Sequence, residues 1–63
     1  MSNDSSLRDA ITYLLDEAEP HGLELECLEY FMVEVSHLLE TLMQLSRDDY
    51  MMAANVALYE WDI

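Results

Sequence analysis

The 63-residue sequence contains no lysine, and its only arginines are Arg8 and Arg47. Against them stand 14 aspartates and glutamates, so the formal net charge at pH 7 is -12. Proteins that bind nucleic-acid phosphates or anionic membranes need basic side chains at the contact surface. The composition therefore argues against direct binding to nucleic acid or to membranes. It favours a partner protein with a basic surface.

Cysteine, glycine and proline occur once each. Cys27 alone cannot form an intramolecular disulfide, and Met1 to Leu7 lack the basic start and apolar core of a signal peptide. We therefore expect a reducing intracellular compartment, the cytoplasm. The longest nearly unbroken apolar run, Met51 to Tyr59, has about half the length needed to span a bilayer.

Hydrophobic residues make up 52% of the chain, too many for a disordered acidic tail. The sequence predicts one small acidic helical domain over residues 1–63. A chain of this size buries only about 60% of the surface that its unfolded form exposes. Sharing a core with a second copy is a usual remedy, so we expect a homodimer.

An apolar stripe between Leu23 and Leu45 predicts the central helix. Its members alternate three and four residues apart, as on one face of a helix. They are Leu28, Phe31, Val35, Leu38, Leu42 and Leu45. Met32 and Leu39 widen the stripe beyond the seam of a two-stranded coiled coil. We expect this face to contact more than one neighbouring helix.

Helical spacing predicts a first helix of roughly three turns before this stripe. Its apolar residues are Leu7, Ala10, Ile11, Leu14, Leu15 and Ala18, and Tyr13 lies off their stripe. Ser6 and Asp9 are spaced as a capping box at the start of the helix. Pro20 and Gly22 predict its end and a tight turn. So short a connection makes the first two helices antiparallel neighbours.

A third helix is predicted from Tyr50 to Trp61, with Ser46 or Asp48 as its cap. A continuous helix through residues 46–49 is the alternative. One face carries Tyr50, Ala53, Ala54, Ala57, Leu58 and Trp61. The remaining sides carry Met51, Met52, Val56 and Tyr59. These apolar sides are enclosed by a second copy or form a Met- and aromatic-rich patch for another partner.

The predicted architecture is an all-α, three-helix antiparallel bundle completed by homodimerisation. The residues expected in its core or in the dimer interface are Leu28, Phe31, Val35, Leu38, Leu42, Leu45, Tyr50, Ala54, Leu58 and Trp61.

An up, down and up arrangement would gather acidic groups at one end of the bundle, without lysine or arginine. They are Asp16, Glu17, Glu19, Glu24, Glu26, Glu29, Glu60, Asp62 and the terminal carboxylate of Ile63. Because duplex DNA carries one negative charge per roughly 1.7 Å of axis, such an array could occupy a groove built for phosphates. Tyr30, Val33 and Tyr59 are candidate anchors for the partner. The alternative is an acidic surface that only keeps the protein soluble.

Chemical motifs are few. Glu34 and His37 match a Glu-x-x-His metal-binding unit, but a di-metal site needs two such units and two further glutamates. A dimeric metal-binding protein is therefore only a third hypothesis, and we expect neither a metal nor another cofactor. Cys27 lacks a neighbouring cation that would lower its pKa, and we expect a buried thiol. We expect no enzyme.

The favoured hypothesis is a stoichiometric inhibitor that occupies the basic nucleic-acid-binding site of an intracellular protein. In size, helicity and charge the whole chain is similar in kind to the short acidic proteins of phages that act against host defence, including some anti-CRISPR proteins. This resemblance implies the cytoplasm of a host cell if a phage encodes the chain. The alternative is a helical adaptor or antiactivator that binds a regulator through its apolar Met and aromatic face.

Overall fold

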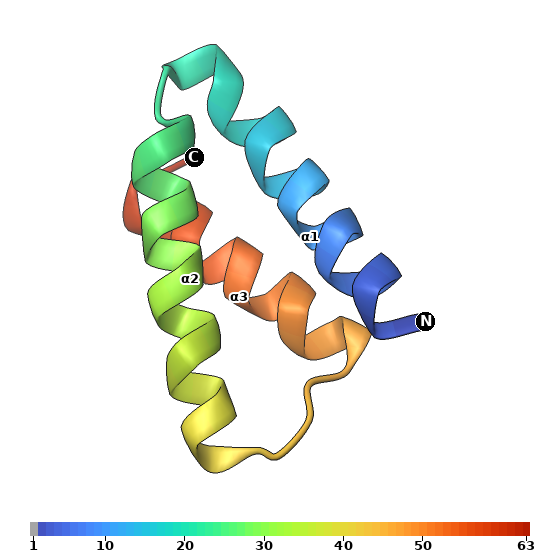
Figure 1. The fold of residues 1–63 in the computed structure, drawn as a ribbon. Helices are drawn as coiled ribbons and strands as arrows, with labels where there is room; N and C mark the ends of the chain where they lie inside the picture. The colour runs from blue at the N-terminus through green and yellow to red at the C-terminus, as the bar shows by residue number, and fades with distance from the viewer. Residues whose placement is uncertain (1) are drawn as a thin grey trace.

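The computed structural model describes residues 2–63, with side chains from residue 5 onward. Within this range the chain forms α1 (Ser2–Ala18), the short 3-10 helix η1 (Glu19–His21), α2 (Glu24–Thr41) and α3 (Arg47–Glu60), without any strand. α1 and α2 diverge from the turn that joins them, and α3 packs against both (Figure 1). The prediction of three packed helices in an all-α fold is confirmed.

α1 is longer than predicted. It begins at Ser2, so Ser6 lies inside the helix and is not its N-cap. The prediction failed because the residues before Ser6 are also good cap formers and do not mark a single start. Tyr13 also differs from expectation, since it packs against the core. Its hydroxyl donates a hydrogen bond to Asn55 Oδ1 of α3 over 2.6 Å.

The turn between α1 and α2 forms where Pro20 and Gly22 predict it. Pro20 lies in the first turn of η1, where its missing N–H costs no hydrogen bond. Gly22 has a φ of 68°, in the left-handed region that a residue without Cβ adopts at low cost. Its N–H donates to the carbonyl oxygen of Glu19 over 3.0 Å and closes the turn.

α2 ends at Thr41, four residues before the predicted end at Leu45. Leu42 already has extended backbone angles, and residues 42–46 form the connection to α3. Leu45 is nevertheless buried. The apolar spacing continued past the end of the helix because a loop residue can also be buried, and the sequence contains no Gly or Pro there to mark the break.

α3 begins with a capping box. The hydroxyl of Ser46 accepts a hydrogen bond from the Asp49 N–H over 3.2 Å, and Asp49 Oδ2 accepts one from the Ser46 N–H over 2.9 Å. These bonds satisfy two amides at the helix start. Ser46 is therefore the cap, and the alternative of a continuous helix through residues 46–49 is wrong.

α3 ends in a Schellman motif. Asp62 adopts a left-handed φ of 57°. Its N–H donates to the carbonyl oxygen of Tyr59 over 3.0 Å, and the Ile63 N–H donates to that of Leu58 over 3.1 Å. This pairing satisfies the last carbonyls of the helix. The turn also folds Ile63 back onto the core, so the C-terminus lies near the start of α2 (Figure 1).

Small residues dominate the core where α1 meets α3. The buried hydrophobic residues are Ala10, Leu14, Ala18, Cys27, Phe31, Leu45, Ala53, Ala54, Ala57 and Leu58. Five of them are alanines of α1 and α3, and small side chains permit close approach of two helices. Phe31 of α2 is the largest fully buried side chain and packs against this cluster.

The residues predicted for the core or dimer interface fall into three groups. Phe31, Leu45, Ala54 and Leu58 are buried. Leu28, Val35, Leu38 and Tyr50 are half-buried and pack against the core. Leu42 and Trp61 are exposed.

No helix within residues 2–63 has both the length and the apolar character to cross a membrane.

Candidate functional site at the acidic pole

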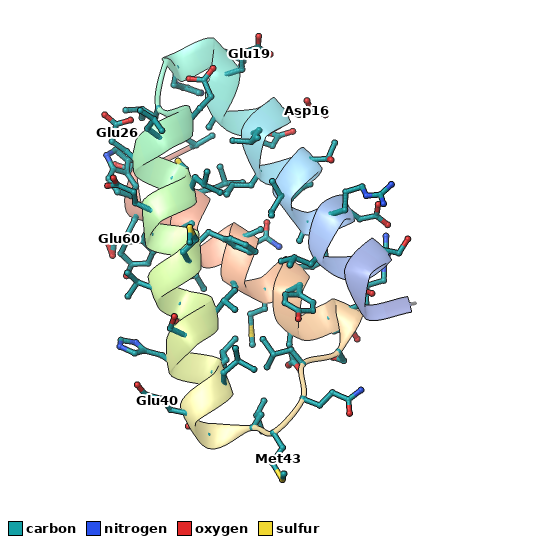
Figure 2. The ribbon with its side chains drawn as sticks, viewed as in Figure 1. Asp16, Glu19, Glu26, Glu40, Met43 and Glu60 are labelled. Carbon is teal, nitrogen blue, oxygen red and sulfur yellow. The ribbon has the colours of Figure 1, made fainter. Side chains whose placement is uncertain are left out.

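The last turns of α1, η1 and the first turns of α2 lie together at one end of the molecule, and the end of α3 lies beside the first half of α2, with Glu60 next to Tyr30 (Figure 2). We call this end the acidic pole. Its members are the predicted acidic groups Asp16, Glu17, Glu19, Glu24, Glu26, Glu29, Glu60, Asp62 and the terminal carboxylate of Ile63. Figure 2 labels Asp16, Glu19, Glu26 and Glu60. The aspartate and glutamate side chains of the acidic pole are all exposed except that of Glu24, which is half-buried.

Helix geometry favours part of this charge. Glu24 and Glu26 lie in the first turn of α2, where free backbone N–H groups and the helix dipole stabilise carboxylates. Glu60 and Asp62 have the opposite situation, because they lie at the end of α3, where the dipole is unfavourable to a negative charge. The carboxylates of Glu60 and Asp62 therefore lower the stability of the fold.

The two arginines lie away from the acidic pole. Arg47 begins α3, and its Nη1 lies 2.8 Å from Asp9 Oδ2 of α1, in an exposed ion pair. Arg8 is exposed and lies about two helical turns before Asp16. Since the sequence has no lysine, no arginine or lysine neutralises the carboxylates at the pole.

A shallow depression of about 250 Å3 opens within the acidic pole. It is lined by Glu26, Glu29, Tyr30 and Val33 of α2 and by Trp61 at the end of α3. The Tyr30 and Trp61 rings meet edge to face, with centroids 5.9 Å apart and an interplanar angle of 88°. This contact joins the end of α3 to the first half of α2, and it leaves an aromatic wall beside two carboxylates.

The Tyr30 hydroxyl points to the same carboxylate surface. It donates a long hydrogen bond of 3.4 Å to Glu60 Oε2. Partial loss of hydration raises the pKa of Tyr30 above its ordinary value of 10.0, and the carboxylates of Glu60 and Glu34 raise it further. The hydroxyl therefore stays protonated at neutral pH and remains a donor within the acidic pole.

Carboxylates beside aromatic rings suit a cationic side chain. A guanidinium can form two parallel hydrogen bonds with a carboxylate and also stack on an aromatic ring. An ammonium group is attracted by both features as well. The sequence predicted Glu26, Glu29 and Tyr30 for partner binding, but it assigned Trp61 to the core or dimer. The sequence signal that could have placed Trp61 in the partner-binding surface was its position next to Glu60, at the end of the third helix.

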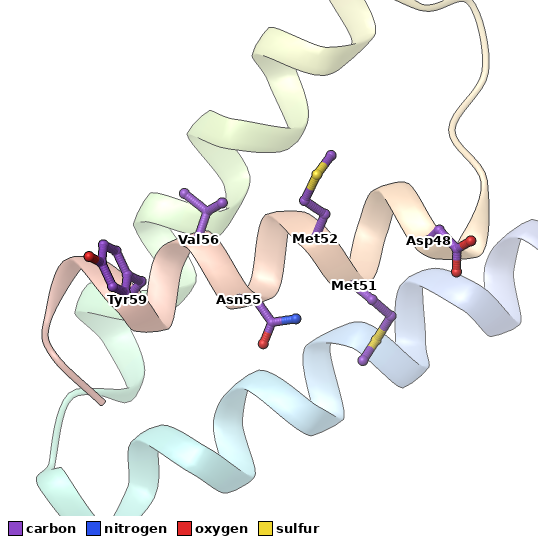
Figure 3. A pocket seen from close by; sticks show the side chains of 6 residues that line it. All are labelled: Asp48, Met51, Met52, Asn55, Val56 and Tyr59. Atoms are coloured by element: carbon purple, nitrogen blue, oxygen red, sulfur yellow. The ribbon is translucent and has the colours of Figure 1, made fainter.

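A second candidate surface runs along the outer side of α3 (Figure 3). It is an open groove of about 560 Å3 lined by Asp48, Met51, Met52, Asn55, Val56 and Tyr59. Met52 and Tyr59 are largely exposed, whereas Met51 and Val56 are half-buried. These are the four residues that the sequence predicted for an apolar partner surface, together with two polar neighbours.

The other predicted chemical groups line neither the depression nor the α3 groove. Cys27 is buried, and its burial and the neighbouring Glu26 raise the pKa of its thiol above the ordinary value of 9.0. His37 is exposed and Glu34 is half-buried on α2. In the described part of the chain, no three His, Cys, Asp or Glu side chains come close enough to hold a metal ion.

Comparisons of the chain with models of protein families, with curated proteins and with solved structures find no match.

Proposed function

We propose that this chain is a stoichiometric inhibitor that occupies the basic nucleic-acid-binding site of a cytoplasmic protein. The acidic pole is the contact surface. The observation that carries the proposal is the concentration of unneutralised carboxylates around an aromatic-lined depression, with both arginines elsewhere. An acidic solubilising surface needs no such polarity. This profile is that of a DNA mimic of the phage anti-defence or anti-CRISPR type.

Charge and apolar contacts have different roles in this proposal. Opposite charges on the two partners accelerate their encounter and align them, but exposed pairs contribute little affinity each. Retention comes from a few desolvated anchors near the centre of an interface, which are often aromatic. Tyr30 and Trp61 supply such anchors between the carboxylates of Glu26 and Glu29. We expect an arginine or lysine of the partner to enter this depression.

We also propose that the chain is a homodimer. The support is the amount of apolar surface left uncovered on a chain of 63 residues. The exposed large hydrophobic residues are Leu25, Met32, Val33, Leu39, Leu42, Met43, Met52, Tyr59 and Trp61. Three of them, Leu25, Met32 and Leu39, recur seven residues apart along one side of α2, and an apolar surface of this kind is typical of one that another protein covers.

A pair of charge-matched variants tests the role of the acidic pole. Glu26→Gln with Glu29→Gln removes two carboxylates from the pole, and Glu40→Gln with Asp48→Asn removes two exposed carboxylates elsewhere. Each variant is used as immobilised bait in a nuclease-treated lysate of the cells in which the chain is found. Bound proteins are quantified by mass spectrometry, and helicity is checked by circular dichroism.

We expect the wild type and the control variant to capture the same nucleic-acid-binding protein. The amount of this protein bound to the pole variant should be at least 10-fold lower. An equal decrease in bound protein for both variants would show that only the net charge of the chain matters. Full retention by the folded pole variant would contradict the proposal.

The second candidate is a helical adaptor or antiactivator that binds through the α3 groove. The supporting observation is the exposure of Met52 and Tyr59 next to Val56, because flexible thioethers and aromatic rings suit adaptable protein interfaces. Here Met52→Ser with Val56→Ser should abolish capture of the partner, and capture should be insensitive to duplex DNA. Loss of the dimer alone would instead assign this side to self-association.

A further inference from the structure

The outward side of α2 carries a second regular apolar stripe. Its members are Leu25, Leu28, Met32, Val35 and Leu39 of α2 and Leu42, the C-cap residue that follows the helix, and we call this stripe the outer seam. They alternate three and four residues apart, which is the a and d spacing of a coiled coil. Leu25, Met32 and Leu39 are 72%, 60% and 50% exposed. Leu28 and Val35 pack partly against the core of their own chain, so α2 has a coiled-coil seam that its own chain covers only in part.

The outer seam borders an apolar groove. Leu7 and Ile11 of α1 form one wall, and the other comprises Leu28, Phe31, Met32, Val35 and Ser36 of α2. The groove has a volume of about 380 Å3 and lies between α1 and α2. These two helices diverge from the turn that joins them (Figure 1). Such a groove can accept the ridge of a third helix.

We propose that α2 of a second copy lies antiparallel along the outer seam and enters this groove. The inference rests on the homodimer proposed above and does not depend on what the acidic pole binds. Because the two copies are identical, each α2 contacts both α1 and α2 of the other, and the interface has two-fold symmetry.

The spacing of the seam fits pairing with itself. When two seams overlap fully in antiparallel orientation, Leu25 meets Leu42 of the second copy. Leu28 then meets Leu39 of the second copy, and Met32 meets Val35. Each of the six seam residues thus has an apolar partner, and each contact occurs twice, as a two-fold interface requires.

The glutamates that flank the outer seam favour an antiparallel pair of α2 helices over a parallel pair. In a parallel pair, Glu24 of one copy lies beside Glu29 of the other, because flanking positions five residues apart are neighbours there. In the antiparallel pair, Glu29 lies beside Ser36 of the second copy. The antiparallel arrangement therefore avoids two like-charge contacts in a chain of net charge -12.

The length of the seam suits an interface between two copies. A stable interface takes about 800 Å2 from each partner. That is less than a fifth of the 4419 Å2 that the chain exposes. The outer seam follows nearly all of α2, or about 27 Å at 1.5 Å per residue, and Leu7 and Ile11 add a second contact line. The α3 groove offers a shorter apolar surface, with Asp48 and Asn55 among its lining residues.

A matched pair of methionine variants tests the surface. Met32→Glu places a charge in the outer seam, and Met52→Glu places the same charge on α3 at a residue of similar exposure, 51%. Sedimentation velocity is measured on both variants and the wild type from 5 to 200 µM. We expect a dimer for the wild type and Met52→Glu, and a monomer with wild-type helicity for Met32→Glu. Leu39→Glu is the substitute if Met32→Glu does not fold.

The outcomes separate the two proposals. A monomeric wild type at 200 µM would overturn the homodimer and therefore the seam. A dimeric wild type with a dimeric Met32→Glu variant would overturn the seam alone. Dissociation by Met52→Glu, with or without dissociation by Met32→Glu, would also overturn the specific role of the seam. None of these results depends on a target for the acidic pole.

Disulfide trapping tests the orientation. Leu25→Cys and Leu42→Cys are oxidised separately and as an equimolar mixture, with buried Cys27 left in place. The antiparallel dimer predicts a covalent dimer only in the mixture. Efficient linking of Leu25→Cys to itself would show a parallel pair and overturn the orientation.

Discussion

At the scale of single residues, the centre of the molecule depends on side chains with little or no polar character. Ala54 and Ala57 of α3 are fully buried, and Cys27 of α2 is buried in the same cluster. No buried side-chain nitrogen or oxygen within the described residues lacks a hydrogen-bond partner. Specific polar contacts, such as that of Tyr13 with Asn55, therefore lie at the edges of the helix contacts.

The Cys27 thiol should be unreactive in the folded protein. Burial and Glu26 raise its pKa, and the nucleophilic thiolate is disfavoured. Reaction with Ellman's reagent at pH 8 should be at least 100-fold slower than in 6 M guanidinium chloride. Equal rates in both solutions would contradict the packing of Cys27.

The same pKa shift predicts a pH dependence of stability. Folding raises the pKa above 9.0, so the unfolded thiol ionises first as the pH rises. The contribution of Cys27 is therefore fully present below pH 9.0 and is lost above it. Cys27→Ala should reduce the fall in the free energy of unfolding between pH 8 and 10. An unchanged fall would contradict this assignment.

The hydrogen bond from Tyr13 to Asn55 should contribute measurably to the contact between α1 and α3. Tyr13→Phe removes the hydroxyl and should lower the free energy of unfolding by about 1 kcal/mol, or the melting temperature by roughly 4 °C. The control is Tyr59→Phe, which removes the same group from an exposed ring. Equal melting temperatures for the two variants would show that the bond has no net effect.

At the scale of helices, stability depends on how each element ends. α3 has a capping box at Ser46 and a Schellman motif at Asp62, so free backbone groups at both ends are satisfied. Asp62 is an unusual choice for that motif because glycine adopts left-handed backbone angles without steric cost. Its carboxylate also lies at the negative end of the helix dipole.

Replacement of Asp62 should therefore stabilise the fold. Asp62→Asn removes the unfavourable charge and should raise the melting temperature by a few degrees. Asp62→Gly should raise it further, to a gain of about 1 kcal/mol, because it also removes the left-handed strain. Thermal denaturation followed by circular dichroism provides the comparison. A lower melting temperature for Asp62→Gly than for Asp62→Asn would contradict the role of strain.

The sequence predicted the elements whose signals are local. Pro20 and Gly22 marked one turn, and Ser46 marked the start of α3, because each of these residues has a strong backbone or capping preference. The end of α2 was not predicted. Leu45 continues the apolar spacing of the helix, but it lies in the following loop, from which its side chain reaches the protein interior. Trp61 was not assigned to the depression because its edge-to-face contact with Tyr30 depends on how α2 and α3 pack.

At the scale of the whole molecule, charge and apolar surface are distributed on different sides. The depression in the acidic pole and the outer seam share no residue, although Glu29 of the depression flanks the seam. Dimerisation along the seam would therefore leave Glu26, Tyr30, Val33 and Trp61 of the depression accessible. In the antiparallel dimer the two poles would lie at opposite ends of the assembly. Such a dimer would present two acidic surfaces and keep their mutual repulsion low.

Salt should stabilise the folded chain. At 10 mM ionic strength the Debye length is about 30 Å. This is close to the longest dimension of the molecule, 33 Å, so its carboxylates repel one another across the whole fold. Raising NaCl from 10 to 300 mM should increase the melting temperature by roughly 4 °C or more at constant protein concentration. The increase should be smaller for Glu26→Gln with Glu29→Gln, and a salt-independent melting temperature would contradict this account of the charge.

Competition with duplex DNA shows whether the acidic pole occupies a nucleic-acid-binding site. The partner captured by the wild-type chain is held at fixed concentration, and its release is measured as a 20-base-pair duplex or NaCl is added. We expect the duplex to displace the chain stoichiometrically and the affinity of the chain for its partner to fall steeply with salt. Simultaneous binding of the chain and the duplex to the same partner would show that the acidic pole does not occupy a nucleic-acid-binding site.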